Sequence, residues 1–156
     1  MLNPIGLKSE FQKMGDPLSS LFEGFPSTFE ESIERLGYCF TVYCQDVIPI
    51  STSVSIAITA FKNRLLQLSL NMMNGRTVFP DALNILLTTL GSGMLNTNIV
   101  VVTPIFFTEV DFDPLWNLGF SGGSADACLS LFVSIVHNKF LISNCENKDG
   151  VIIYWT

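Results

Sequence analysis

The stretch at residues 120–142 reads FSGGSADACLSLFVSIVHNKFLI. Two glycines free the backbone just ahead of Ser124, and serine is a good N-cap for a helix. Asp126 follows in the first turn, where the helix dipole favours a carboxylate. Most of the residues beyond the cap are apolar. The stretch therefore predicts a helix over about residues 124–142, apolar on most of its circumference and packed on several sides.

The polar residues of this predicted helix form one narrow stripe. Asp126, Ser130, Ser134 and His137 follow i, i+4, i+8, i+11 spacing, which places them on one helix face. These are the residue types of a hydrolase triad. One shared helix face does not make a triad, however, because the serines lack a strained elbow and nothing indicates an oxyanion hole. We interpret the stripe as a contact with a neighbouring subunit, with His137 also complementing the C-terminal helix dipole.

The glycine-rich segment at residues 119–127 is the one candidate phosphate loop, because glycines ahead of a helix N-terminus can hold an anion. It resembles the glycine- and serine-rich loop of small-molecule kinases that phosphorylate isoprenoid and sugar precursors. Those enzymes are much longer, their other motifs have no counterpart here, and no Walker lysine follows the loop. We interpret the segment as a flexible lead-in and helix cap, and no cofactor is predicted.

The composition is unusual for a free soluble monomer. Of the 156 residues, 48% are hydrophobic and only 14% are charged. Ordinary domains carry about 25% charged residues, so this chain cannot cover its surface with charge in the usual way. Either it lies in a membrane or other subunits cover much of its surface.

The longest uncharged run argues against a membrane. Residues 82–108 carry no charge, but Gly91, Ser92, Gly93 and Asn96 divide the run into two pieces. Each piece is shorter than the roughly 20 residues that a spanning helix needs. The amino end lacks the basic region, apolar core and cleavage site of a secretory signal. We expect a soluble protein made in the cytoplasm, without a membrane partner.

The distribution of charges and cysteines argues against a nucleic-acid-binding surface and against metal sites. The net charge is −6 and the eight Lys and Arg are scattered, so no basic nucleic-acid surface is predicted. The four cysteines have no C-x-x-C spacing and accompany a single histidine, so we expect reduced thiols and no zinc site. Glu109, Asp111 and Asp113 alternate as calcium ligands can, but the glycine turn and later glutamate of a calcium loop are missing. We expect an exposed acidic loop and no metal site.

Three further helices are predicted from periodicity and caps. The first begins with a capping box, Ser27 to Glu30, and continues to about residue 47 with an apolar face. Pro49 ends it, and a second helix covers about residues 52–73, making the two helices neighbours. A third begins with Pro80 at its first position and continues to about residue 96, unless the glycines at 91 and 93 end it earlier.

The two ends of the chain are expected to reach outward. Residues 1–26 are read as an N-terminal arm of extended chain or short turns, because Pro and Gly interrupt every periodicity. Its apolar residues, Leu2, Ile5, Leu7 and Phe11, pack either on a neighbour or on the chain's own core. Residues 99–110 are read as an extended segment, and residues 143–156 as a β-hairpin turning at Asn147–Gly150. Its apolar second strand, with Ile153 and Trp155, needs a partner edge or a covering surface.

The predicted fold is therefore mainly α. About four helices pack around a central apolar helix at about residues 124–142, with an extended segment near residues 99–110 and a small C-terminal β-hairpin. Residues 27–156 form a single domain behind the N-terminal arm.

Several motifs of this chain resemble those of small virion structural proteins of large contractile-tailed bacteriophages. The first is a helix closing at Tyr43–Val47, followed by Ile-Pro-Ile-Ser-Thr at 48–52 and an alanine-containing turn at 57–61. The others are Gly-Gly-Ser-Ala at 122–125, opening a long apolar helix, and a chain end with Asn144, Asn147, Gly150 and Trp155. The similarity covers about residues 29–156. This chain departs from that group where Ile48-Pro49 replaces Pro-Pro, and in having less alanine.

The resemblance implies a non-enzymatic subunit of a virion, made in the host cytoplasm and bound to copies of itself and to other virion proteins. Two other classes stay open. One is a small membrane-active, holin-like protein. The other is a small phosphate-binding enzyme that uses the Gly-Gly-Ser helix N-terminus.

Overall fold

The computed structural model describes residues 1–14, 25–48, 50–71, 75–96, 99–100, 111–146 and 149–156. Within these residues the fold is mainly α, as predicted, with six helices and five short strands. The helices are α1 Pro4–Met14, α2 Phe29–Gln45, α3 Val54–Asn71, α4 Gly75–Ser92, α5 Asp113–Phe120 and α6 Ala125–Ile142. The strands are β1 Ile50–Ser51, β2 Met94–Asn96, β3 Ile99–Val100, β4 Asn144–Glu146 and β5 Ile152–Tyr154.

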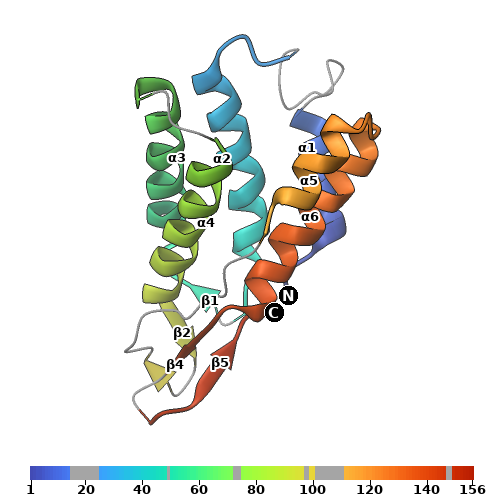
Figure 1. Cartoon of the computed structure of the whole chain (residues 1–156). Coiled ribbons are helices and arrows are strands. Elements are labelled where there is room, and N and C mark those ends of the chain that lie inside the picture. The colour runs from blue at the N-terminus through green and yellow to red at the C-terminus, as the bar shows by residue number, and fades with distance from the viewer. Residues whose placement is uncertain (15–24, 49, 72–74, 97–98, 101–110, 147–148) are drawn as a thin grey trace.

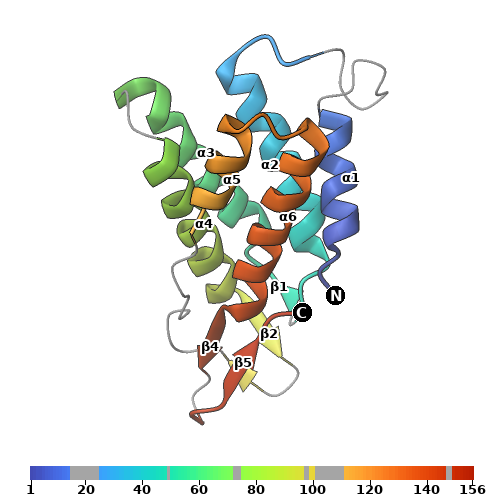
Figure 2. The ribbon, with the colours of Figure 1, turned by 45° about the vertical axis from the view of Figure 1, so that its right-hand side comes forward.

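The long helices pack side by side in the order α4, α3, α2, α1, α6, with α5 against α6. In Figures 1 and 2, α3 and α4 lie on one side of the bundle and α1, α5 and α6 lie on the other. The strands and both ends of the chain lie together at one end of the bundle.

Five phenylalanine rings, one from each long helix, form a closed circuit in the core. The centroid distances are 5.9 Å from Phe11 to Phe40, 4.9 Å from Phe40 to Phe61 and 6.1 Å from Phe61 to Phe79. Phe132 closes the circuit at 5.4 Å from Phe79 and 5.2 Å from Phe11. Edge-on and tilted pairs at these separations are favourable beyond the area they bury. This phenylalanine cluster ties all five long helices into one core.

α6 forms over the predicted range with the predicted cap, since the Ser124 side chain accepts a hydrogen bond from the Ala127 N–H at 3.1 Å. Its burial is one-sided, which corrects the prediction of packing on several sides. Val136 and Phe140 are fully buried, whereas Ser130 and Ser134 on the polar stripe are exposed. α6 is therefore one wall of the bundle and not a central helix.

The prediction of an extended or turn-rich N-terminal arm is wrong for residues 4–14, which form α1. Asn3 begins the helix by accepting the Gly6 N–H on Oδ1 at 3.0 Å, and Pro4 occupies the first position, where its missing N–H costs nothing. α1 packs on α2 and α6. Residues 15–24 lie outside the described part of the chain.

α2 begins one residue later than predicted. Thr28, not Ser27, is its N-cap, and its hydroxyl accepts the Glu31 N–H at 3.0 Å. The Glu31 carboxylate accepts the Ser27 N–H at 2.7 Å and also pairs with Arg35. These contacts, the Ser27 backbone bond first, lower the pKa of Glu31 to about 2. Arg35 is buried and also donates to the Met14 carbonyl oxygen at 3.1 Å, which joins the end of α1 to α2.

α3 and α4 occur in the predicted order, but their first and last residues differ from the predicted ones. α3 covers most of the predicted range, and α4 begins at Gly75, so Pro80 lies inside the helix and not at its first position. A proline there removes one helical hydrogen bond. Burial of the turn before Pro80 offsets the lost hydrogen bond, because Val78 is fully buried and Phe79 packs on the core. α4 ends at Ser92, between the two glycines that were predicted to end it before residue 96 if they interrupt the helix.

The strands form two small antiparallel sheets at the end of the bundle. One has the order β1-β2-β3, in which Ile50 pairs with Leu95 and Leu95 with Val100. The other is the predicted C-terminal hairpin of β4 and β5, with Cys145 opposite Ile153. β3 is an edge strand at the start of the predicted extended segment. Pro49, residues 101–110 and the turn residues Asn147 and Lys148 lie outside the described part of the chain.

The chain's last residue also has a strand-like partner. Thr156 donates its N–H to the Ile48 carbonyl oxygen at 3.0 Å and accepts the Ile48 N–H at 2.9 Å. The link after α2 thus supplies a partner edge from the same chain, as the hairpin requires.

Gly93 is required by a close approach of two backbones just after α4. Its carbonyl oxygen accepts the Thr52 N–H at 2.9 Å, and a Cβ added at Gly93 would lie 2.7 Å from the Ser53 backbone nitrogen. We expect Gly93→Ala to lower the free energy of unfolding by roughly 1–3 kcal/mol through overpacking. Chemical denaturation followed by circular dichroism measures this.

The matched control for Gly93 is Gly119→Ala in α5. A Cβ there meets nothing within 4 Å. Alanine is better than glycine in a helix, so this variant should gain about 0.5–1 kcal/mol. Equal stabilities for the two alanine variants would refute the close-approach argument.

Candidate functional site

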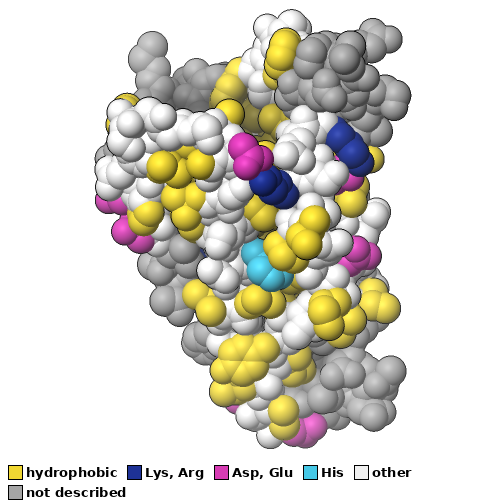
Figure 3. Space-filling model, turned by 90° about the vertical axis from the view of Figure 1, so that its right-hand side faces the viewer, with side chains coloured by type: hydrophobic (Ala, Val, Ile, Leu, Met, Phe, Trp, Pro, Cys, Tyr) yellow, Lys and Arg dark blue, Asp and Glu magenta, His cyan; other side chains and the backbone are white. Residues whose placement is uncertain are grey.

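The polar stripe lies beside a shallow groove between α1 and α6. The groove has a volume of about 290 Å³. Figure 3 shows this face, with the single histidine of the chain (cyan) at its centre. Both helices line the groove, with Pro4, Ile5 and Lys8 from α1 and Ser130, Val133, Ser134 and His137 from α6.

At one end of the stripe, Asp126 joins α6 to α1. Its carboxylate lies 2.8 Å from Lys8 Nζ and accepts a 3.4 Å hydrogen bond from Gln12. The Asp126 side chain is largely exposed, so such a pair contributes below about 1 kcal/mol to stability. Ser130 donates its hydroxyl to the Asp126 carbonyl oxygen at 2.8 Å, within its own helix. This end of the stripe is a surface contact between two helices of one chain.

At the other end of the stripe, His137 pairs with a buried tyrosine of α2. Tyr43 Oη lies 2.6 Å from His137 Nδ1. Burial raises the pKa of Tyr43 well above its usual range, so the phenol stays protonated. An imidazole protonated on Nε2 accepts the phenol hydrogen on Nδ1, and one protonated on Nδ1 donates to the phenol oxygen, so either neutral tautomer makes this hydrogen bond. His137 thus joins α6 to α2.

The stripe residues share a face, as predicted, but they do not form a catalytic set. No hydrogen bond joins His137 to Ser130 or Ser134 in the described part of the chain, and Asp126 is committed to α1. A serine nucleophile needs the histidine within about 3.2 Å to take its proton. The geometry supports helix contacts more than acid–base chemistry.

The pKa of His137 is lowered by burial. Because the folded-state pKa lies below the ordinary 6.5, the unfolded chain binds the proton more tightly, and the folded state loses stability as pH falls through 6.5. We expect the imidazole signal in NMR to titrate with a midpoint below 6.5 in the folded protein. The chain has one histidine, so the assignment is unambiguous. The same signal in urea should titrate near 6.5, and equal midpoints would contradict the burial argument.

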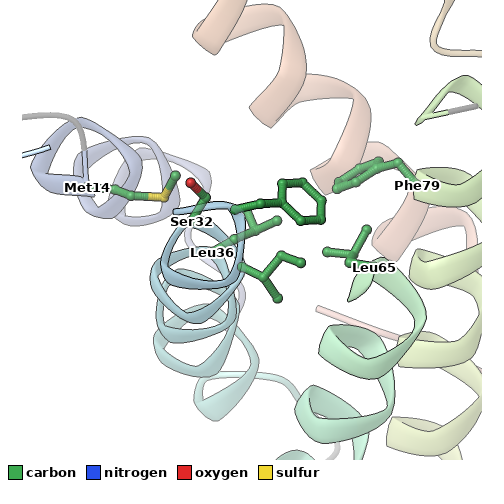
Figure 4. A pocket seen from close by; sticks show the side chains of 7 residues that line it. Met14, Ser32, Leu36, Leu65 and Phe79 are labelled. Atoms are coloured by element: carbon green, nitrogen blue, oxygen red, sulfur yellow. The ribbon is translucent and has the colours of Figure 1, made fainter. Parts of the chain in front are cut away.

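A second hollow, of about 200 Å³, is apolar and lies where α1, α2, α3 and α4 converge (Figure 4). Met14, Leu36, Leu65 and Phe79 point toward it. Its one hydroxyl belongs to Ser32, which donates to the Thr28 carbonyl oxygen at 3.0 Å. Binding sites combine an apolar lining with a few polar groups that orient the ligand, and the described lining of this hollow does not offer them.

Four of the interface candidates pack inside this chain. Leu2, Leu7, Phe11 and Trp155 are buried in the core, which is the alternative that the sequence left open for both ends of the chain. They belong to elements that fold back on the bundle, and burying them there removes apolar surface from water without a partner.

The remaining interface candidates keep different amounts of surface. Ile5 is 81% exposed and Ile153 is half-buried against the core. Of the polar stripe, Asp126, Ser130 and Ser134 are exposed and His137 is half-buried. A contact between subunits at these residues stays a prediction.

Six exposed apolar residues lie at the strand end of the molecule, and of these the sequence indicated only those of the terminal strand as needing a covering surface. We call this set the apolar end. Its members come from the link after α2, the last turn of α6 and the hairpin. They are Ile48, Leu141, Ile142, Val151, Ile152 and Tyr154, each of them exposed. In Figure 3 hydrophobic side chains (yellow) gather on the lower part of the face, where the hairpin lies.

The strand β5 is apolar on both faces, while Asn144 and Glu146 of β4 pair with Tyr154 and Ile152 and share their outward face. Trp155 on one face is fully buried, with its ring 5.7 Å from Phe140. Ile152 and Tyr154 alternate with the buried side and are 55% and 57% exposed. A strand with one face in water normally alternates apolar and polar residues. The sequence signal for an outward apolar face on β5 is the lack of alternation, because Val-Ile-Ile-Tyr-Trp at residues 151–155 contains no charged or amide side chain.

The glycine-rich segment has a structural role. Gly122, at φ +82°, donates to the Gly119 carbonyl oxygen at 3.2 Å, and Gly123 donates to the Leu118 carbonyl oxygen at 2.9 Å. This pattern is the Schellman motif that ends a helix, here α5. Ser124 then caps α6. Both helix ends are thus satisfied by the chain itself, as the interpretation of a lead-in and cap requires.

Cysteines and acids show no ligand arrangement in the described part of the chain. Cys39 and Cys44 are free and buried, and burial raises the pKa of Cys39 to about 12, so its thiol is inert. Asp111 Oδ1 accepts the Asp113 N–H at 2.8 Å, while Glu109 lies outside the described residues. No group of three or more His, Cys, Asp or Glu that could hold a metal occurs among the described residues.

The comparisons with known proteins give no family. No protein-family model, no curated protein and no solved structure matches the chain.

Proposed function

We propose that this chain is a non-enzymatic structural subunit of a large protein assembly, acting through contacts between subunits. The observation that carries the proposal is the set of exposed apolar side chains at the apolar end, among them Ile152 and Tyr154 on the outward side of β5. Exposed apolar patches of this kind on soluble proteins mark interaction sites. The low share of charged residues, 14%, fits a surface that is covered in the assembled state.

A virion is the particle we propose, on the resemblance to small structural proteins of contractile-tailed bacteriophages. The motifs that carry the resemblance are structural. Gly122 and Gly123 end α5, Ser124 caps α6, and the terminal Trp155 anchors the hairpin. Copies of itself and other virion proteins are the proposed partners, with the host cytoplasm as the place of synthesis.

Size-exclusion chromatography with light scattering tests the assembly proposal on the full chain. The expected result is a particle heavier than the 17.2 kDa of one chain, growing with concentration. A monodisperse 17.2 kDa monomer at high concentration, without partners, would refute it.

A membrane-active protein is the second candidate, because α6 alone among the described helices is long and apolar enough to cross a membrane. The core helix of a soluble protein passes the same test, so length and composition alone carry little weight. The exposed side of α6 carries Asp126, Ser130, Ser134 and Asn138, together with Leu141 and Ile142 in its last turn. Lipid would meet the four polar side chains as well as the two apolar ones, and polar groups in lipid are costly. Recovery of the chain in the detergent phase when it is expressed alone would favour this candidate instead.

A further inference from the structure

The turn of the C-terminal hairpin places an aspartate directly before a glycine. Asp149 and Gly150 are both exposed, and Gly150 has a φ of +75°, in the left-handed region that glycine adopts without steric cost. Glycine has no side chain that could hinder an approach to its backbone nitrogen. The nearest atom to the place of a Cβ is a Glu146 carboxylate oxygen at 3.5 Å, an ordinary contact. The turn therefore leaves the Gly150 nitrogen accessible to the carboxyl group of Asp149.

The Gly150 N–H is also not fixed by a hydrogen bond. Within the described part of the chain, no backbone or side-chain oxygen accepts this N–H. In a helix or a strand ladder the amide after an aspartate is held by such a bond, which keeps its nitrogen directed at the acceptor. Exposed loop tips are the places where a backbone amide keeps its freedom to react.

Every other aspartate of the chain lacks this combination. Each is followed by a proline, by an amide that is already hydrogen-bonded, or by a bulky buried residue. Proline, which has no N–H, follows Asp16 and Asp113; a bonded amide follows Asp46, Asp81 and Asp126; and the buried Phe112 follows Asp111. The structure thus singles out one aspartate.

We propose that Asp149 is a site of spontaneous isomerisation to isoaspartate in the folded protein. The Gly150 nitrogen attacks Cγ of Asp149, an N–Cγ bond forms, and the carboxyl OH leaves with the amide hydrogen as water. Water then opens the resulting succinimide ring. Opening at the former backbone carbonyl breaks the original peptide bond, so the chain continues through Cβ and Cγ and that carbonyl becomes a carboxylate. No oxidant or cofactor takes part, and the product has the mass of the original chain.

The product changes the hairpin because Cβ of Asp149 becomes part of the main chain. Glu146 pairs with Ile152 at the turn end of the two strands, so the added methylene strains this pair first. β5 is then held less firmly against β4. We expect faster hydrogen exchange of the amides at Ile152–Tyr154 in the modified chain.

The test is incubation of the folded full chain for weeks at physiological temperature and neutral pH, followed by cleavage after glutamate. The fragment 147–156 contains Asp149 as its single aspartate. A methyltransferase specific for isoaspartate labels the modified fragment, and chromatography separates it from the unmodified fragment of equal mass. The level of isoaspartate at Asp149 should be at least tenfold above that at any other aspartate. Isoaspartate that arises from an asparagine, as in Asn74-Gly75, is distinguished because deamidation changes the mass.

Asp149→Glu is the matched variant, because it keeps the charge while its longer side chain must close a larger ring that forms more slowly. It should show no isoaspartate in this fragment and unchanged exchange at Ile152–Tyr154 after the same incubation. A wild-type sample unfolded in urea gives the intrinsic rate of the Asp-Gly sequence. A folded chain that reacts more than tenfold more slowly than the unfolded chain would show that the turn protects Asp149, which overturns the proposal. Equal loosening of β5 in incubated Asp149→Glu would overturn the expected effect on the hairpin.

Discussion

Replacing Phe40 with alanine should lower the free energy of unfolding by about 3–5 kcal/mol, the usual cost of deleting a buried aromatic ring. Phe40 is fully buried in α2 and sits between Phe11 of α1 and Phe61 of α3. Its removal opens the circuit of the phenylalanine cluster and leaves a cavity where three helices meet. Domains of this size have about 5–15 kcal/mol of stability in total, so the loss is a large share.

Urea denaturation followed by circular dichroism measures the effect, with Phe120→Ala as the control. Phe120 ends α5 and is 81% exposed, so the same chemical change there should alter stability by no more than about 0.5 kcal/mol. A Phe40→Ala variant that unfolds at the same urea concentration as Phe120→Ala would show that the cluster does not hold the helices together.

The helices that the sequence locates correctly are those with local signals. Ser124 caps α6, and a capping box opens α2 within one residue of the predicted place. These signals depend on neighbours within four residues, so the sequence carries them completely. The hairpin is predictable for the same reason, since its turn residues and apolar strand are contiguous.

α1 escapes prediction although its signal is also local. Asn3 followed by Pro4 is a cap and a first helical position, but Pro4 and Gly6 also resemble interruptions of a helix. The start of α4 is mispredicted because Pro80 suits a first position better than a sixth, and only the burial of Val78 shows why the helix begins earlier. Tertiary packing overrides local preference there.

The arrangement of the candidate site could not come from the sequence. The polar stripe is recognisable as one face of α6, but its partners are Lys8 of α1 and Tyr43 of α2, far away in the chain. Nothing in residue spacing says that these helices flank α6. The outward face of α6 is also hard to predict, because apolar residues at half-buried positions look the same in a sequence as fully buried ones.

The sequence also does not identify which apolar residues near the chain's ends stay exposed. Leu2, Trp155 and Ile152 are similarly hydrophobic, yet two are buried in the chain's own core and one faces outward. The sequence names Leu2, Ile5, Leu7, Phe11, Ile153 and Trp155 as contact candidates at the chain's ends, but it does not separate those that the core buries from those that stay exposed. The structure separates the two sets through the alternation of β5, which directs Trp155 inward and Ile152 outward.

Trp155→Ala is the second change that we expect to be severe, with a loss of about 3–5 kcal/mol. Trp155 is fully buried and its ring packs edge-on against Phe140, so it fastens the hairpin to α6. Hydrogen exchange should then show faster exchange of the β5 amides, because the inward face of the strand has lost its anchor. Unchanged exchange at Ile152–Tyr154 would contradict this role for the indole.

Trp155→Phe separates the packing of the ring from its polar atom. The indole N–H is buried without a hydrogen-bond partner among the described residues, and a buried donor left unpaired costs about 1–3 kcal/mol. Phenylalanine removes this donor and keeps an aromatic ring against Phe140, so the variant should lose less than about 1.5 kcal/mol. Denaturation of the two variants side by side decides the point, since equal losses would mean that a phenylalanine ring does not replace the packing of the indole against Phe140.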